Sequence, residues 1–334
     1  MNRSERSPAR RRWTAALAVL AAALAVPTAS AQSAWPNRTI RMVVPFPPGG
    51  GADVLARTLS EALSKRLGQP IIVENRPGVG GNLGTDAVAK AAPDGYTLLM
   101  TPPAPIAQAV ALYRKLPYDP RTDLVMISDV AQARLACAVN PQVPASTFPE
   151  LLAWAKANPG KLTIGSWGPG THPHMVQAML DRTFGTQTVH VPYKGEAPMV
   201  SDLIGGQIAM SCSAVTTLKP HLEAGRLRAL ATIGPNRAAL LPDLPAFAEI
   251  GYPQEVLKLT GPVTLLAPAR TPVEVIERVG REAAAFVRSP EMTRQIETMG
   301  MEPIGNLPAE AAAGYAARLP VLTGAIRDTG TTLD

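Results

Sequence analysis

The feature that most constrains the fold is a strand that passes through a glycine-rich turn directly into a helix. Residues 43–59, VVPFPPGGGADVLARTL, run from branched apolar side chains through prolines and three consecutive glycines into leucines spaced every four residues. This spacing predicts an amphipathic helix, which should end at Gly68. Residues 162–180, LTIGSWGPGTHPHMVQAML, repeat the order of strand, turn and helix. Both stretches favour an α/β fold.

The remaining strand and helix patterns alternate along the chain. We predict strands at residues 39–44, 70–75, 96–101, 136–140, 162–165, 189–193, 207–212, 227–234 and 262–268. We predict further helices at residues 147–160, 173–184, 197–206, 272–288, 290–300 and 308–327. A strand, a helix and a strand in succession imply parallel pairing with a right-handed crossover. These strands are enough for two separate sheets.

The first 31 residues predict an export signal. Five arginines up to Arg12 precede an apolar segment at residues 14–26, and Ala29, Ser30 and Ala31 match a cleavage site. We expect cleavage near Ala31 and a mature chain outside the cytoplasm. The arginines that precede Trp13 leave both the general secretory route and the twin-arginine route open.

Composition and charge exclude several classes of protein. The 334-residue chain is 46% hydrophobic and 17% charged, which is typical of a packed globular protein of about two domains. Without the export signal, which carries five arginines and one glutamate, the formal net charge falls from +6 to +2. No long apolar run follows Gln32, and no basic stripe with interleaved aromatics occurs. We therefore expect neither membrane insertion nor nucleic-acid binding.

The two cysteines, Cys137 and Cys212, lie in apolar stretches that are predicted as strands. An exported chain can hold a disulfide, and a buried cysteine can equally remain a free thiol. We expect buried free thiols and keep a disulfide as the alternative.

The two glycine-rich turns are candidate anion-binding sites. Each helix begins directly after a backbone with few side chains, so its first N–H groups are unpaired and its dipole presents a positive end. The alternative is that the glycines serve only the tight backbone geometry. If two sheets face a common crevice, both helix starts point into it. We interpret Asp53, in the first turn of its helix, as a structural cap.

Nucleotide and hydrolase motifs are incomplete. Residues 78–84 place Leu83 where a dinucleotide-binding loop needs its third glycine. Ile164 occupies the position of the first glycine in a serine-hydrolase elbow around Ser166. We therefore expect no nucleotide cofactor and no catalytic serine.

Three histidines are the remaining candidate for a metal site. His172 and His174 are two residues apart and can bind a metal together with His190, but no further ligand follows at a recognisable spacing. We expect no metal or other cofactor and interpret His174 as a helix residue that packs inward.

Six stretches along the mature chain carry a family signature in order. They are PFPPGGGADVLAR (45–57), VENRPGVGGNLGTDAVAKAAPDGYTLL (73–99), GSWGPGTHPHM (165–175), VPYKGEAPMVSDLIGGQI (191–208), GRLRALA (225–231) and LPDLPAFAEIGYP (241–253). In these stretches the chain resembles the Bug-type solute-binding receptors of the tripartite tricarboxylate transporter system. The most specific signature is NRPGVGGNLG followed by PDGYTLL.

The resemblance implies a type II periplasmic-binding-protein-like fold, in which two α/β lobes are joined by two hinge strands. We place the export signal at residues 1–31, the first lobe at 32–133 and 258–334, and the second lobe at 134–257. It also implies a monomeric periplasmic receptor that holds a small organic carboxylate and presents it to membrane permease subunits without catalysis. A ligand-sensing adaptor for a signalling receptor and a secreted enzyme on the same scaffold are the alternatives.

The resemblance places ligand contacts on both glycine-rich turns and on the walls beside them. The expected ligand-binding residues are Phe46, Pro48, Gly49, Gly50, Gly51, Thr101, Ser166, Trp167, Gly168, Thr171, Tyr193 and Ser213. Backbone N–H groups and the hydroxyls of Ser166 and Thr171 are donors that suit a carboxylate. Neither turn contains Arg or Lys, so oriented dipoles should hold the anion, and we interpret Lys194 as a solvated loop residue.

Trp167 lies inside the second turn and has two interpretations. It either packs within its lobe or forms a flat wall that stacks on an aromatic or cyclic acid. With Phe46 expected opposite, an aromatic carboxylate is a candidate ligand ahead of citrate.

Overall fold

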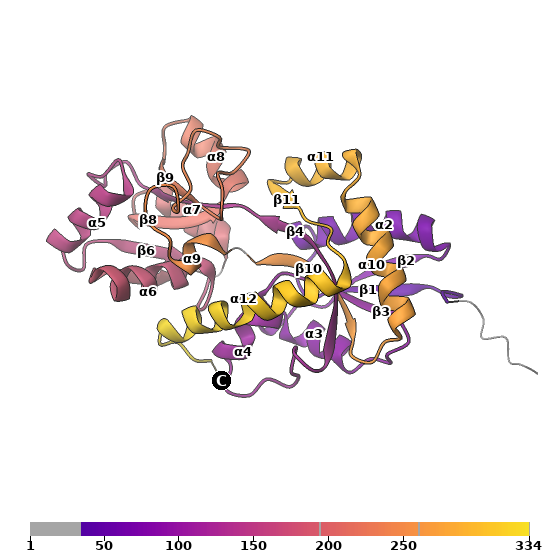
Figure 1. Cartoon of the computed structure of the whole chain (residues 1–334). Helices are drawn as coiled ribbons and strands as arrows, with labels where there is room; N and C mark the ends of the chain where they lie inside the picture. Colours follow the sequence, from indigo (N-terminus) through magenta and orange to yellow (C-terminus); the bar gives the residue numbers. More distant parts are fainter. Residues whose placement is uncertain (1–34, 194, 260, 334) are drawn as a thin grey trace, which may run out of the picture. The chain divides into compact units, whose positions relative to one another are not determined.

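The computed structural model describes residues 35–193, 195–259 and 261–333, and from Arg38 onward the described chain is organised around two β-sheets (Figure 1). The first sheet has the strand order β11-β4-β10-β3-β1-β2. Its strands are β1 (Ile40–Val44), β2 (Ile71–Asn75), β3 (Thr97–Thr101), β4 (Leu124–Ala133), β10 (Pro262–Pro268) and β11 (Met301–Pro303). β1 pairs in parallel with β2 and β3, whereas β10 runs antiparallel to β3 and β4. The sheet is therefore mixed, and only its first three strands have the predicted parallel pairing.

Eight helical segments of the described chain connect or follow the strands of the first sheet, and the first of them is the helix predicted from the leucine spacing. They are α2 (Gly51–Leu67), η1 (Val79–Gly81), α3 (Asn82–Ala89), η2 (Ala104–Gln108), α4 (Ala109–Leu112), α10 (Val273–Val287), α11 (Pro290–Thr298) and α12 (Pro308–Asp328). Leu55, Leu59 and Leu63 of α2 are fully buried, so the four-residue spacing faces the core as predicted. α2 ends at Gly68, whose left-handed backbone (φ 74°) lets its N–H donate to the Ser64 carbonyl.

The second sheet has the strand order β7-β6-β8-β5-β9. Its strands are β5 (Leu135–Val139), β6 (Thr163–Ser166), β7 (Val189–Pro192), β8 (Met210–Ala214) and β9 (Arg228–Ile233). The helices in this stretch are α5 (Phe148–Ala157), α6 (His172–Phe184), α7 (Glu196–Ile204), α8 (Val215–Glu223) and α9 (Glu255–Lys258). β6 is parallel to β7 and β8, and β5 is antiparallel to β8 and β9. The prediction of two sheets is confirmed.

The chain passes between the two sheets twice. β4 ends at Ala133 and β5 begins at Leu135, so Arg134 is the crossing residue. Arg134 is 4% exposed, and its guanidinium pairs with Glu302. The return runs from α9 to β10, which begins at Pro262.

β4 is a strand that the sequence patterns do not predict, because Ser128 and Asp129 interrupt its apolar run. Both side chains are buried in the structure. The Thr264 hydroxyl donates to Asp129 Oδ1 at 2.7 Å, and the Arg318 guanidinium donates to Asp129 Oδ2 at 2.8 Å. The buried carboxylate thereby fastens β10 and α12 to β4.

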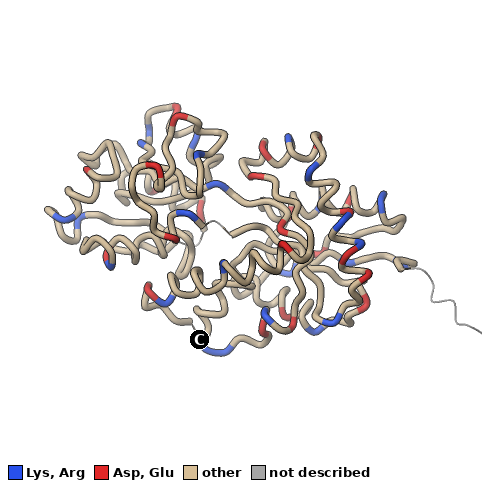
Figure 2. The backbone as a smooth tube through the Cα atoms, in the orientation of Figure 1, with Lys and Arg blue, Asp and Glu red and all other residues tan. Residues whose placement is uncertain are grey.

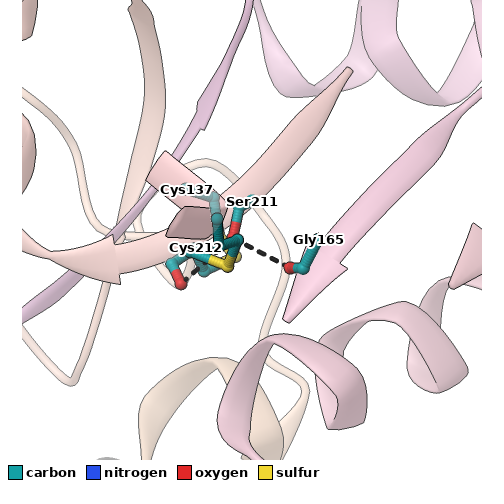
Figure 3. The surroundings of a disulfide bond; sticks show 5 residues. Cys137, Gly165, Ser211 and Cys212 are labelled. Atoms are coloured by element: carbon teal, nitrogen blue, oxygen red, sulfur yellow. Dashed lines mark hydrogen bonds between the residues drawn. A yellow bond between two sulfur atoms is a disulfide. The ribbon is translucent and has the colours of Figure 1, made fainter. Parts of the chain in front are cut away.

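Cys137 and Cys212 form a disulfide, so the expectation of free thiols is wrong (Figure 3). The two residues are direct partners in the antiparallel pairing of β5 with β8. Their apolar surroundings suggested inert thiols, but the strand register, which the sequence does not reveal, places them opposite one another. The bond links two neighbouring strands of the second sheet whose cysteines are 75 residues apart in the sequence.

The described helices and charged residues bear on whether the chain has a membrane span or a basic surface. None of the helices in the described ranges is both long enough and apolar enough to cross a membrane. Basic and acidic residues are interspersed along the described chain (Figure 2).

Candidate ligand-binding site

A cavity of about 400 Å³ brings together residues from the ends of several strands and from both crossings between the sheets. It is lined by Phe46, Gly80, Pro102, Pro103, Ala104, Gln108, Ala133, Leu135, Trp167, Thr171, His172, Gly261 and Leu322. Its volume lies within the range of about 300–1,000 Å³ that is usual for small-molecule sites. Both the first-sheet loops and the second glycine-rich turn contribute to its walls.

The cavity walls are mainly apolar. Apart from the indole N–H of Trp167, the polar side chains among the described lining residues are those of Gln108, Thr171 and His172. His172 is 6% exposed, and its Nε2 atom has no hydrogen-bond partner within the described residues. Burial lowers the pKa of His172 to about 4, so its ring is neutral at pH 7. The histidine at the start of α6 therefore brings no positive charge to the cavity wall.

Two histidines, His174 and His190, form hydrogen bonds with residues of the second glycine-rich turn. His190 Nε2 lies 2.7 Å from the hydroxyl of Ser166, and His174 Nδ1 accepts the N–H of Gly170 at 3.0 Å. The rings of His174 and His190 stack with their centroids 3.7 Å apart. Burial lowers the pKa of both histidines, with His174 reaching about 4. Two neutral stacked rings thus fix the turn that leads into α6.

The start of α6 opens toward the cavity. Thr171 is its N-cap residue in extended conformation, and its side chain does not cap the helix. Instead the Thr171 hydroxyl donates to the Gly168 carbonyl at 2.6 Å. The first-turn amides of α6 and the positive end of its dipole remain without a side-chain cap, which is the arrangement that binds carboxylates in other helices.

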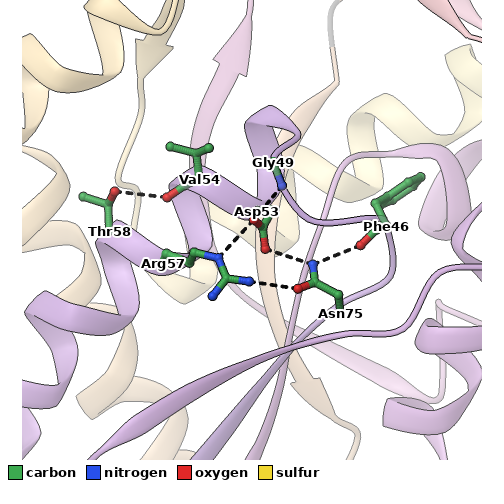
Figure 4. Close-up of polar contacts among 7 residues, drawn as sticks. All are labelled: Phe46, Gly49, Asp53, Val54, Arg57, Thr58 and Asn75. Carbon is green, nitrogen blue, oxygen red and sulfur yellow. Dashed lines mark hydrogen bonds and ion pairs between the residues drawn. The ribbon is translucent and has the colours of Figure 1, made fainter.

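The first glycine-rich turn is organised differently, around a carboxylate of the chain itself (Figure 4). Asp53 is 2% exposed and accepts hydrogen bonds from the Gly49 amide (2.9 Å), Asn75 Nδ2 (2.9 Å) and Arg57 Nε (3.0 Å). Asn75 Nδ2 also donates to the Phe46 carbonyl. Burial alone would raise the pKa of Asp53, but these hydrogen bonds lower it to about 2. The interpretation of Asp53 as a structural cap is confirmed.

Phe46 is positioned on the cavity wall by close contact with Gly81. A Cβ atom at Gly81 would lie 3.0 Å from the Phe46 ring, and the backbone there has a φ of 95°. Both the space and the conformation require glycine. Gly81 of the NRPGVGGNLG signature therefore serves the site through packing, whereas Gly80 of the same signature lines the cavity itself.

Of the predicted ligand-binding residues, Phe46, Trp167 and Thr171 line the cavity. The exposed residues Pro48, Gly49, Gly50 and Gly51 lie outside its lining, as does half-buried Gly168.

Four further predicted residues are not among the lining residues. Thr101 is buried and donates to the carbonyl of lining residue Pro102. Ser166 is fully buried against His190. The Tyr193 hydroxyl donates to Asp202, and the buried hydroxyl of Ser213 has no hydrogen-bond partner within the described residues. Lys194 lies outside the described residues.

Sequence reasoning missed several lining residues. Pro102, Pro103 and Ala104 directly follow the predicted strand at 96–101, so the end of that strand was an available signal. Gly80, Gln108, Ala133, Leu135, His172, Gly261 and Leu322 were also not predicted as ligand contacts. Leu322 comes from the last helix, and nothing in the local sequence indicates that it reaches this cavity.

The alternative of a histidine metal site receives no support from the geometry. Within residues 35–193, 195–259 and 261–333, no group of three or more His, Cys, Asp or Glu side chains is arranged to hold a metal ion. His174 and His190 are stacked face to face and bond to the turn instead.

Comparisons with known proteins agree with this architecture. The family model described as tripartite tricarboxylate transporter family receptor matches residues 55–312. Protein BugT of Bordetella pertussis is 34% identical over 316 residues, which covers 94% of this chain and 96% of BugT.

Two solved structures that are similar to this chain contain a bound carboxylate. A structure described as R. palustris Rpa4515 with adipate is 32% identical, with a TM-score of 0.77, and covers 90% of this chain and 100% of that one. MatC from Rhodopseudomonas palustris with bound malate is 26% identical, with a TM-score of 0.72, and covers 87% of this chain and 100% of that one. The predicted α/β fold of the periplasmic-binding-protein type is confirmed.

Proposed function

Because this chain belongs to the tripartite tricarboxylate transporter receptor family, we propose that it captures a small organic carboxylate in this cavity and presents it to permease subunits of such a transporter. The family consists of solute-binding receptors, and two of its relatives have been solved with adipate and with malate. The observation that carries the proposal is the uncapped start of α6 beside Thr171 and His172 at the cavity wall.

The capture mechanism follows from where the lining residues are attached. We assign residues 32–133 and 258–334 to one lobe and residues 134–257 to the other. Phe46 belongs to the first lobe and Trp167 to the second, and both line the cavity. A ligand that contacts both lobes binds the closed form more tightly than the open form and shifts the equilibrium by that difference in affinity. Closure around the ligand is then the state that the permease recognises.

The predicted site residues take three roles in this proposal. Phe46, Trp167 and Thr171 contact the ligand. Thr101, Ser166, Gly168, Tyr193 and Ser213 support the walls, and Pro48, Gly49, Gly50 and Gly51 form the neighbouring turn at the start of α2.

The receptor acts without chemistry on its ligand. Ser166 and His190, whose hydroxyl oxygen and Nε2 atom lie 2.7 Å apart, resemble a nucleophile and its base. Ser166 is fully buried and its hydroxyl is engaged in the turn, so it serves the shape of the loop. We further propose that the protein is exported and cleaved near Ala31, a segment that lies outside the described residues.

A thermal-shift screen of the mature chain tests the capture of a carboxylate. The panel contains monocarboxylic, dicarboxylic, tricarboxylic and aromatic acids, each paired with its uncharged amide. An acid present at about 100 times its dissociation constant should add about 2.7 kcal/mol of stability, and its amide should add much less. If no acid raises the Tm, or if NMR shows that the stabilising acid is consumed, the proposed function is wrong.

A further inference from the structure

The two helix starts near the site are not equivalent in charge. At the start of α2, the carboxylate of Asp53 already occupies the turn and takes up the Gly49 amide. Its ionic partner, Arg57, is 51% exposed and is shared with Asn75. A ligand carboxylate placed at this turn would face the negative charge of Asp53 at short range, which is unfavourable.

The start of α6 differs from that of α2 in charge, although neither helix has a side-chain cap at its N-cap residue. This helix has 13 residues, and its N-terminal end carries no side-chain cap and no acidic residue in its first turn. Thr171 and His172 line the cavity there, and the buried Nε2 of His172 is without a hydrogen-bond partner among the described residues. The uncapped first turn of α6 beside these two lining residues indicates that a hydrogen-bond acceptor of the ligand belongs at this end of the cavity.

The remaining walls present apolar groups. Phe46, Pro102, Pro103, Leu135, Trp167 and Leu322 surround the rest of the cavity. An unpaired carboxylate that is buried against such groups loses its hydration at a cost of several kcal/mol. An apolar chain or ring in the same place gains about 25 cal/mol for each Å² removed from water.

We propose that this cavity selects carboxylates with a single negative charge and an apolar body, with the carboxylate at the start of α6 and the body against Phe46, Trp167 and Leu322. The inference rests on the proposed function and adds the ligand class. It distinguishes this chain from the two relatives above, which were solved with ligands that carry two carboxylates.

Calorimetric titration of the mature chain with hexanoate, adipate and hexanamide tests the selection. Hexanoate and adipate have the same number of carbons and differ only in whether the far end is a methyl group or a second carboxylate. We expect hexanoate to bind at least about tenfold more tightly than adipate, and hexanamide to bind more weakly than hexanoate. Benzoate against terephthalate repeats the comparison with a ring in place of the chain.

A variant with an added charge tests the same idea as a gain of function. Gln108 lines the cavity, so Gln108→Arg should supply a cation for a second carboxylate and reduce the preference for hexanoate over adipate by at least about tenfold. Gln142→Arg is the matched control, because Gln142 is exposed and outside the cavity lining. The control should keep the wild-type preference, which separates a local contact from a general effect of net charge.

The outcomes separate the inference from the proposed function. If adipate binds wild-type protein as tightly as hexanoate does, the inference is overturned while carboxylate capture stands. If none of the acids binds while the protein remains folded, the proposed function itself fails.

Discussion

Gly170 and Gly50 lie in the two glycine-rich turns and differ in whether a residue with a Cβ atom fits at their position. Gly170 has a φ of 71°, and a Cβ atom there would lie 3.1 Å from Leu112, whereas Gly50 has a φ of −75° and a Cβ atom there would make only an ordinary contact, 4.0 Å from the Pro47 carbonyl. Gly170→Ala should weaken ligand binding about tenfold, because a left-handed alanine costs about 1–2 kcal/mol and displaces the turn before α6. Gly50→Ala should change the affinity less than about twofold. Calorimetric dissociation constants of the two variants check this, and equal effects at both positions would contradict it.

At the same scale, the sequence predicted the roles of some residues better than others. Asp53 was predicted as a cap because an acidic residue in the first turn of a helix has few other local roles. In the structure Asp53 accepts a hydrogen bond from the Gly49 amide, and His174 accepts one from the Gly170 amide. These contacts depend on side-chain geometry, which the spacing of glycines in the sequence does not reveal. The sequence therefore presented the two turns as equivalent, and the structure separates them.

The element that carries the site, α6, should make the stability of the protein depend on pH. The pKa values of His172 and His174 are lowered to about 4 by burial, and unfolding returns them to about 6.5. The unfolded chain then binds more protons than the folded chain between these values, so stability is lost as the pH falls from about 6.5 to about 4. Each histidine should account for up to about 3 kcal/mol. Urea unfolding at several pH values should show this loss, and His172→Phe should reduce the slope of the free energy of unfolding against pH. A free energy of unfolding that is constant over this range would contradict the burial of neutral histidines in α6.

The strands β5 and β8 are joined by the disulfide between Cys137 and Cys212, which closes 75 residues of chain. A loop of this length restricts the unfolded chain enough to stabilise the fold by about 4 kcal/mol. The double variant Cys137→Ala with Cys212→Ala should therefore unfold at a lower temperature, and a reducing agent should lower the Tm of the wild type but leave the variant unchanged. Equal Tm values for the oxidised wild type and the variant would show that the bond adds nothing.

Element boundaries were largely predictable from the sequence, and pairing was not. The strand at 262–268 was predicted with the same bounds as β10, because its run is mostly apolar and its one polar residue, Thr264, is β-branched and favours a strand. β4 was missed because buried Asp129 and Ser128 look like loop residues until their partners on β10 and α12 are known. The antiparallel pairing of β10 likewise depends on where the chain returns to the first sheet, which local patterns do not encode.

At the scale of the whole molecule, the site is made of distant segments. Phe46, Gln108, Trp167 and Leu322 line one cavity although they span most of the mature chain. The glycine-rich turns pointed to part of this site, but the contributions of the crossing at Leu135 and of α12 arise only when the chain is folded. The candidate site therefore exists only in the folded chain and not in any one local motif.

Filling that cavity tests the central claim most directly. Ala104 lines the cavity, so Ala104→Trp should occupy the space of the ligand, while Ala153→Trp adds the same side chain at an exposed position on α5. With the acid that stabilises the wild type most, calorimetry should give a dissociation constant that is raised at least about 100-fold in Ala104→Trp and is unchanged in Ala153→Trp. An Ala104→Trp variant that is folded and binds the acid as tightly as the wild type would contradict the assignment of this cavity as the ligand site.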